Sequence, residues 1–287
     1  MTNIATIDVE DWFHLLDHEA TQNVATWSSF EKRIEIGLNK ILDLFTKYNT
    51  VGTFFVLGWV ADKYPDLVKE IHLKGHDVAS HSYAHQLVYT MTPEDFRKDL
   101  LSAENAIVNA IGEKPKYYRA PGFSIRSDCK FALKILIKEG YEVDCSIFPA
   151  RRAHGGMKTF PISKPCILIN DNGNEIIEMP INTAKMFGVD YVFSGGGYFR
   201  LFPKPLLNKL YYKSKYNMTY LHPRDLDPEQ PVINDLATLR KFKSYYNLSS
   251  TEEKLDNILK KFHLISISQY LSKQNYQNLP ILELEAF

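Results

Sequence analysis

The first half of the chain alternates short apolar runs with longer segments whose apolar residues recur every three or four positions. Short apolar runs are typical of buried strands, and the three-to-four spacing is typical of amphipathic helices. Strands that alternate with helices in this way favour parallel βαβ units. The pattern predicts strands at residues 4–9, 53–56, 77–79, 117–120 and 142–144 and helices at residues 30–48, 65–73, 93–111 and 128–139.

Residue types at the predicted helix starts support this assignment. Pro65 stands in the first turn of one helix, where its missing N–H costs nothing. Thr92 is the expected cap of the next helix and is followed by two acidic residues, which favour a helix N-terminus. For the helix at residues 30–48 we expect Ser28 or Ser29 as the cap.

The second half of the chain departs from this alternation. Residues 150–197 form glycine- and proline-punctuated β-like segments, which we interpret as an insertion over one face of the fold. Residues 234–271 are mostly helical in pattern and are expected to pack against the outside. A chain of 287 residues can bury one large core, so we predict a single domain over residues 1–287. Its core covers about residues 4–231, with a C-terminal helical extension at about residues 232–287.

Composition narrows the functional classes. The chain has 34 basic and 34 acidic residues, which gives no electrostatic signature of a nucleic-acid partner. Cys129, Cys145 and Cys166 form no CxxC pair, which fits a reducing compartment. No signal peptide is visible and no run approaches the ~18 apolar residues of a membrane span. We therefore expect a cytoplasmic protein without a membrane span.

Polar residues gather where the predicted strands end. In α/β barrels, catalytic side chains lie at the carboxyl ends of the strands. The candidates at such positions are Asp8, Glu10, Asp11, His81, His85, Arg119, Asp144 and His222.

Two histidines and three carboxylates among these candidates suggest a metal site. His81 and His85 are four residues apart, so on one face of a helical turn they could share a metal ion. Two histidines at this spacing are more often ordinary surface or core residues than metal ligands. This pair directly follows a predicted strand, which favours metal binding. Asp8, Glu10 and Asp11 would repel one another if buried without a cation, although a solvated turn would also accommodate them. One carboxylate and two histidines would leave metal positions open for water and substrate.

Three further features have competing interpretations. Arg119, before a proline-glycine turn, could hold a carboxylate ionised or cap backbone carbonyls. The glycines at residues 195–197 lack the phosphate-loop pattern and are not expected to open a helix, which argues against nucleotide binding. They could present Tyr198 to a sugar or form a purely structural turn. Trp12 and Trp59 could stack on a sugar or pack in the core.

The order of these motifs resembles the polysaccharide deacetylases of carbohydrate esterase family 4, which share the NodB-homology domain. The similar segments are residues 52–58 (GTFFVLG), 75–81 (GHDVASH), 119–122 (RAPG), 144–149 (DCSIFP) and 221–222 (LH). Within the family the chain is most similar to a branch associated with bacterial exopolysaccharide and surface-glycan biosynthesis. That similarity lies in residues 8–14 (DVEDWFH), 194–200 (SGGGYFR) and 222–231 (HPRDLDPEQP).

The resemblance implies an α/β fold, a distorted (β/α) barrel, and removal of an N-acetyl group from an amino sugar of a surface glycan or its precursor. It implies a divalent metal, zinc or alternatively cobalt, held by His81, His85 and one acid. Asp8 would be the general base, His222 the general acid and Arg119 the residue that orients the base. Asp144 would tune His222 or line that side of the pocket. The expected sugar contacts are Trp12, Pro121, Tyr198 and Leu221.

The first motif departs from the family pattern of two adjacent aspartates. Asp8 can be the base, with the metal acid being Glu10 by strand alternation or Asp11 after a turn. Alternatively, Glu10 and Asp11 match the adjacent pair and Asp8 supports them from behind. We favour Asp8 as base and Asp11 as ligand, with Glu10 as the alternative ligand. Ala84 also stands where the family often has serine or threonine.

Two other functions remain open at this stage. The same fold could hydrolyse another non-peptide C–N bond, as in a ureide or a cyclic imide. A catalytically inactive glycan-binding module would instead require a broken metal site. The histidines, the acids, Arg119 and His222 are all present, which favours the enzyme.

Overall fold

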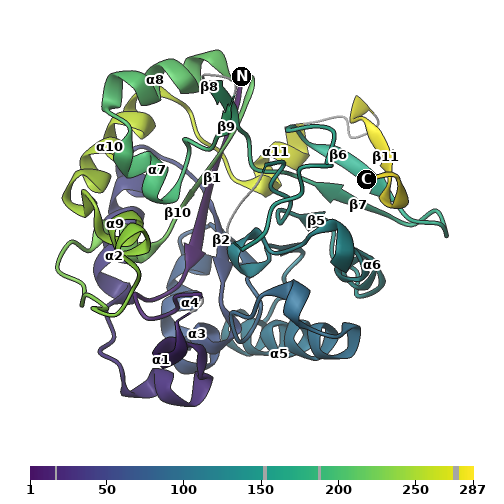
Figure 1. The fold of residues 1–287 in the computed structure, drawn as a ribbon, viewed down its shortest axis with the longest axis horizontal. Helices are drawn as coiled ribbons and strands as arrows, with labels where there is room; N and C mark the ends of the chain where they lie inside the picture. Colours follow the sequence, from purple (N-terminus) through teal and green to yellow (C-terminus); the bar gives the residue numbers. More distant parts are fainter. Residues whose placement is uncertain (17, 151–153, 187–188, 274–277) are drawn as a thin grey trace.

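A mostly parallel nine-stranded sheet forms the centre of the computed structural model (Figure 1), which describes residues 1–287 except 17, 151–153, 187–188 and 274–277. The strand order is β10-β1-β2-β3-β4-β5-β7-β6-β11, and β6 runs antiparallel to β7. Strands β8 and β9 form a separate antiparallel pair. The strands are β1 (Thr2–Val9), β2 (Thr53–Val56), β3 (Asp77–Ser80), β4 (Tyr117–Tyr118), β5 (Val143–Asp144), β6 (Cys166–Ile169), β7 (Glu175–Glu178), β8 (Ala184–Met186), β9 (Val189–Tyr191), β10 (Tyr216–Leu221) and β11 (Ile281–Glu283).

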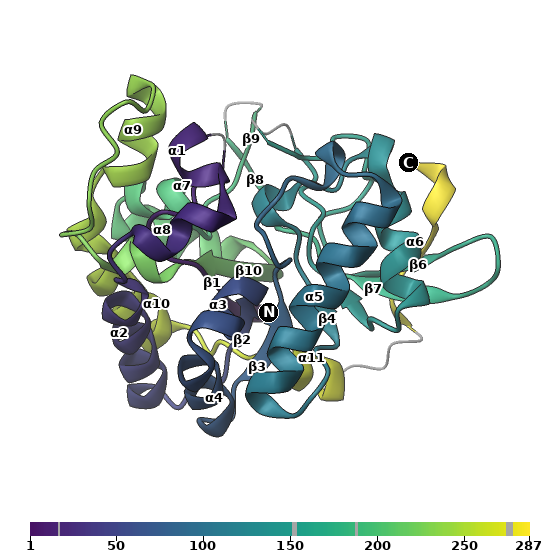
Figure 2. The ribbon, with the colours of Figure 1, turned by 90° about the horizontal axis from the view of Figure 1, so that it is seen from below.

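Helices surround this sheet (Figures 1 and 2). Helix α5 packs on α3 and α4, helix α10 packs on α2, and α11 contacts β1. No helix in the described part of the chain is both long and apolar enough to cross a membrane. The helices are α1 (Glu19–Gln22), α2 (Ile34–Lys47), α3 (Gly58–Lys63), α4 (Pro65–Leu73), α5 (Pro93–Ile111), α6 (Phe131–Lys138), α7 (Gly196–Leu201), α8 (Lys204–Lys213), α9 (Thr238–Tyr245), α10 (Thr251–Lys261) and α11 (Ile267–Lys273).

Strand alternation separates the inside of the curled sheet from its outside. Ile4 on β1 belongs to an inner apolar cluster that also contains Phe55 of β2 and Met218 of β10. Ile7 and Val9 of β1 belong to the outer cluster, which packs under the helices. Because side chains alternate along a strand, positions 6, 8 and 10 follow Ile4 toward the inside.

The sheet closes through side chains where β10 faces the segment after β7. Asn182 Oδ1 accepts from the backbone N–H of Met218 at 2.8 Å, and Asn182 Nδ2 donates to Asn217 Oδ1 at 3.2 Å. Side-chain bonds thus join these two parts of the curled sheet. The result is the predicted α/β architecture, a distorted barrel.

Most predicted elements of the first half are confirmed, and the first long helix shows the main boundary error. Thr92 caps α5 by accepting from the N–H of Asp95 at 3.1 Å, as expected. Helix α2 begins at Ile34 rather than residue 30, and Ser28 and Ser29 lie in a preceding 3₁₀ helix. The cap prediction for α2 was wrong because the acceptor comes from another part of the chain, as described below.

The interpretation of residues 150–197 as a cover over one face was wrong for β6 and β7. Strand β7 pairs in parallel with β5, and β6 pairs with β7, so this hairpin extends the edge of the sheet. The C-terminal part is mostly helical as predicted, but β11 adds a further strand to the same edge. A strand of three residues is too short to reveal itself by alternation.

Gly196 opens helix α7, which contradicts the expectation that residues 195–197 do not begin a helix. Gly195, just before the helix, allows the backbone at this point to lie close to β10. A Cβ at Gly195 would lie 2.1 Å from the carbonyl oxygen of Tyr220, so only glycine fits this contact.

Candidate metal centre and surrounding polar site

Glu10, His81 and His85 converge just beyond the carboxyl ends of β1 and β3. The Glu10 Oε1 atom lies 3.0 Å from Nε2 of His81 and 3.0 Å from Nε2 of His85. All three residues are buried. Burial alone would raise the pKa of Glu10, but the neighbouring histidines His85, His81 and His222 hold it well below its usual value. The carboxylate is therefore ionised and faces two imidazoles.

The other ring nitrogen of His81 makes the kind of hydrogen bond that supports a histidine ligand of a metal. Its Nδ1 lies 2.7 Å from the backbone carbonyl oxygen of Arg119, which can only accept, so Nδ1 carries the hydrogen. In a neutral ring Nε2 is then a bare lone pair that faces the Glu10 carboxylate. Two acceptors 3.0 Å apart need a proton or a metal ion between them. A backbone carbonyl that fixes the tautomer is also the usual support of a histidine ligand, so these residues fit a divalent metal.

The histidine pair lies on a loop rather than on the expected helical turn. Ser82 and His85 both have positive φ, 69° and 53°, which breaks any helix between them. Asp99 on α5 organises this loop by accepting from the N–H groups of Tyr83 and Ala84, each at 2.9 Å. Ala84 makes its hydrogen bond to Asp99 through its backbone N–H, so this contact needs no serine or threonine side chain at position 84.

Asp11, which we favoured as the metal ligand, does not lie beside the two histidines, and we correct this choice. Asp11 Oδ1 accepts from the N–H of Trp12 at 2.7 Å, and Oδ2 accepts from the N–H groups of Arg33 at 2.9 Å and Ile34 at 3.0 Å. Asp11 thus supplies the cap at the start of α2. Strand alternation continues one residue past β1, so the acid beside the histidines is Glu10.

Asp8 lies next to this cluster and is held by Arg119, as predicted. Arg119 is fully buried, and its Nη1 donates to Asp8 Oδ1 at 2.5 Å and to Thr6 Oγ1 at 2.9 Å. The other Asp8 oxygen, Oδ2, lies 3.8 Å from Nε2 of His222. The guanidinium compensates the buried charge of Asp8 and fixes its orientation.

His222 follows β10 and faces the same point from the other side. Its Nε2 lies 4.0 Å from Glu10 Oε1, and its side chain remains 22% exposed, more than the side chains of Asp8 and Glu10. Asp225 Oδ2 lies 2.9 Å from Nδ1 of His222. Burial lowers the pKa of His222, but the bond to Asp225 and the charges of Glu10 and Asp8 outweigh it and raise the pKa to about 9. The ring is protonated at neutral pH.

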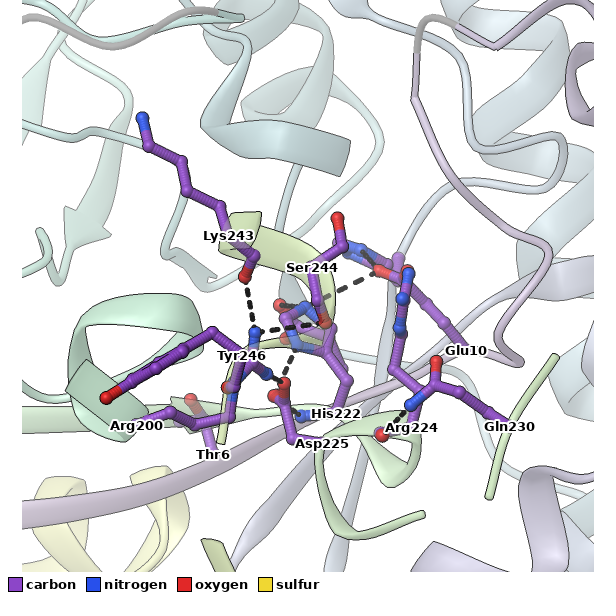
Figure 3. A network of polar contacts seen from close by, with 12 residues as sticks. Thr6, Glu10, Arg200, His222, Arg224, Asp225, Gln230, Lys243, Ser244 and Tyr246 are labelled. Atoms are coloured by element: carbon purple, nitrogen blue, oxygen red, sulfur yellow. Dashed lines mark hydrogen bonds and ion pairs between the residues drawn. The ribbon is translucent and has the colours of Figure 1, made fainter. Parts of the chain in front are cut away.

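Arg200 anchors Asp225 from behind, as Figure 3 shows. Its Nη1 donates to Asp225 Oδ1, and its other nitrogens donate to the carbonyl oxygens of Lys243 at 2.5 Å and Tyr246 at 3.1 Å. Burial raises the pKa of Asp225, but Arg200 and His222 reverse this and hold it far below its usual value. Sequence reasoning gave neither Arg200 nor Asp225 a role. The available signal was that each lies in a segment that resembles the exopolysaccharide-associated branch.

Asp144 does not contact His222, contrary to the expected tuning role. Its Oδ1 accepts from Ser146 Oγ at 2.5 Å, its Oδ2 accepts from the N–H of Ser146 at 3.2 Å, and the carboxyl group of Glu178 lies beside it. Burial, and then the charge of Asp144, raise the pKa of Glu178 well above its usual value. Val143 and Cys145 face the inner cluster, so Asp144 between them points away from it. Asp225 takes the position beside His222 that we had expected for Asp144.

The structure does not bring all four expected sugar contacts to the site. Trp12 is 7% exposed; its Nε1 donates to the carbonyl of Glu31 at 2.9 Å, and its ring packs on Phe13. Leu221 is fully buried in the outer cluster and faces the helices. These two predictions are corrected to packing roles. Tyr198 is 37% exposed on α7, and Pro121 is buried directly after β4, so their contact with a sugar stays a prediction.

A curled, mostly parallel sheet with a polar cluster at the carboxyl ends of its strands makes this protein a distorted α/β barrel, which fits the NodB type of fold. Comparison with protein families agrees. The model "Polysaccharide deacetylase" matches residues 20–142, and the model "Domain of unknown function (DUF3473)" matches residues 145–272. The first match supports a polysaccharide deacetylase domain. Strand β1, which contains Asp8, and Glu10 directly after it precede both matches.

Curated relatives match part of the chain. A peptidoglycan-N-acetylglucosamine deacetylase of Bacillus cereus is 33% identical over 94 residues, which is 32% of this chain and 34% of the relative. The peptidoglycan-N-acetylmuramic acid deacetylase PdaA of Bacillus subtilis is 28% identical over 123 residues, 42% of this chain and 46% of the relative. The chain thus spans less than half the length of these relatives. Neither is described as an exopolysaccharide enzyme.

Solved structures share the fold over nearly the whole chain. A candidate polysaccharide deacetylase from Mycobacterium smegmatis has a TM-score of 0.65 at 18% identity, with 97% of this chain and 92% of that chain covered. A family 4 pseudoenzyme from Bacillus anthracis has a TM-score of 0.53 at 16% identity, with 98% and 69% covered. At these identities the likeness shows the fold alone.

Proposed function

We propose that this protein is a metal-dependent hydrolase that removes the N-acetyl group from an amino sugar of a bacterial surface glycan or its precursor. The observation that carries the proposal is the convergence of Glu10 Oε1 with Nε2 of His81 and Nε2 of His85, because one carboxylate and two imidazoles at this spacing are suited to hold a divalent ion. The relatives that are described as deacetylases of peptidoglycan support an N-acetylated sugar as substrate.

Glu10, His81 and His85 would hold the ion, with zinc as the expected metal and cobalt as an alternative. Once bound, the metal would polarise the acetamide carbonyl and lower the pKa of the attacking water. Asp8 would take the proton of that water. Arg119 serves this step because its hydrogen bond to Asp8 Oδ1 fixes the orientation of the carboxyl group.

His222 would give its proton to the departing sugar amine. Its pKa of about 9 keeps it protonated at neutral pH, and it is the more exposed partner in the site. Asp225 holds the ring by Nδ1, so that Nε2 faces Asp8 and Glu10. The proposed base and acid therefore lie beside each other and next to the proposed metal ligand Glu10.

The inactive-module alternative has a specific point of comparison, since one structural neighbour is described as a pseudoenzyme. In this chain the three proposed metal ligands, the proposed base and the proposed acid are all brought together. The presence of this complete set of residues favours an enzyme over a binding module.

Acetate release from chitooligosaccharides and from peptidoglycan fragments tests the proposal. We expect release that stops with a chelator, returns with zinc or cobalt, and is lost in Asp8→Asn. Arg126→Gln, at an exposed arginine paired with Asp128, is the matched control and should keep full activity. Metal binding without acetate from any sugar would instead favour a ureide or cyclic imide as substrate.

A further inference from the structure

Helix α9 presents apolar side chains to solvent in the part of the chain that the structure describes. Leu239 and Phe242 of α9 are 68% and 48% exposed, Tyr246 directly after the helix is 42% exposed, and α9 contains no buried residue. The spacing of three places Leu239 and Phe242 on one side of the helix. The rings of Phe242 and Tyr246 lie 4.6 Å apart, so these two form a continuous surface. Single exposed apolar residues are ordinary, but three within one short helix and the residue after it are not.

The charge of α9 has one sign. Its sequence, TLRKFKSY, contains three basic residues and no acid. Arg240 points inward and donates to His154 Nε2 at 2.7 Å and to the carbonyl of Leu16. Lys243 is exposed, and Figure 3 shows its side chain extending away from the polar network. A basic helix with an apolar face complements a surface that is apolar inside and anionic outside.

The shape of this region favours a bilayer over a protein partner. Helix α9 stands at the periphery of the molecule (Figure 2). A projecting helix edge can insert Leu and aromatic side chains between headgroups, and aromatic and lysine residues are enriched at membrane interfaces.

The same segment is joined to the catalytic region. The carbonyl oxygens of Lys243 and Tyr246 accept from Arg200, which pairs with Asp225 and through it with His222. A membrane contact at α9 would therefore lie at the rim of the site.

We propose that Leu239, Phe242 and Tyr246, with Lys241 and Lys243, form a docking surface for a bilayer that carries anionic headgroups. This proposal does not rest on the deacetylase function.

Co-sedimentation with vesicles tests it. The full chain should bind vesicles of phosphatidylcholine with phosphatidylglycerol, and bind vesicles of phosphatidylcholine alone much more weakly. The double variant Leu239→Ser/Phe242→Ser should lose about tenfold or more of the affinity, because two inserted side chains are removed. Lys241→Glu/Lys243→Glu should weaken binding to the anionic vesicles most. Leu73→Ser, at a 73% exposed leucine on α4, should bind like the parent.

Three results would overturn the proposal. They are no binding to either vesicle, equal binding by the Leu239→Ser/Phe242→Ser variant, and a dimer in light scattering that this variant abolishes. The last would identify a second copy of the chain as the occupant of α9. Circular dichroism of each variant separates loss of folding from loss of binding.

Discussion

Nδ1 of His222 lies 2.9 Å from the carboxylate of Asp225, three residues further along the chain. This bond leaves Nε2 of the ring facing Asp8 and Glu10. The pairing is local in sequence, but it depends on Arg200, which reaches Asp225 from α7. The position of the proposed acid is thus set by a buried chain of charge-assisted hydrogen bonds.

Replacing Asp225 by asparagine should move the alkaline limit of activity to lower pH. Asp225 is a main cause of the raised pKa of His222, about 9, so its loss lowers that pKa. His222 then loses its proton at a lower pH and cannot donate. The measurement is kcat/KM against pH. Asp227→Asn is the matched control, since Asp227 pairs with Arg33. If the alkaline side of the kcat/KM profile did not shift in Asp225→Asn, Asp225 would not be what raises the pKa of His222.

Arg119→Lys should lower kcat while KM changes little. Lysine keeps a positive charge but lacks the planar group whose one nitrogen binds both Asp8 and Thr6. We expect a fall of about tenfold to a hundredfold, because the proposed base loses its orientation. Steady-state kinetics measure this, with Arg97→Lys at the exposed pair with Glu139 as control. A change confined to KM would argue for a substrate-binding role of Arg119 instead.

Glu178→Gln should make stability less dependent on pH. The folded-state pKa of Glu178 is raised well above its ordinary value, so the folded protein holds a proton that the unfolded chain releases. The stability that this proton contributes is complete at low pH and is lost as pH rises above the usual range of glutamate. Glutamine keeps the shape and cannot ionise.

Urea unfolding between about pH 5 and about pH 9 measures the effect of Glu178→Gln. The variant should lose less unfolding free energy over this range than the parent. Glu142→Gln, at an exposed pair with Lys116, should follow the parent. Parallel curves for the parent and Glu178→Gln would show that the buried pair with Asp144 carries no proton.

The features that could be predicted from the sequence are those that depend on the local periodicity of strands and helices. Alternation along β1 predicts that Asp8 and Glu10 share a face, and strand ends predict His81 and Arg119 nearby. The wrong choice of Asp11 over Glu10 has a non-local cause, since Asp11 is occupied by the start of α2 more than twenty residues later. The partner of His222 was missed for the same reason. Asp144 lies away from His222 because β5 turns this side chain toward Glu178. Asp225 lies beside His222 because Arg200 binds it from α7.

Equilibrium zinc binding by the parent, Glu10→Gln and Asp11→Asn tests the central claim most directly. The account predicts about one zinc per chain for the parent and for Asp11→Asn, and a large loss in Glu10→Gln, because Glu10, unlike Asp11, faces both histidines. Asp11→Asn should instead be less stable, since it loses part of the cap of α2. Loss of zinc in Asp11→Asn with retention in Glu10→Gln would contradict the proposed metal centre.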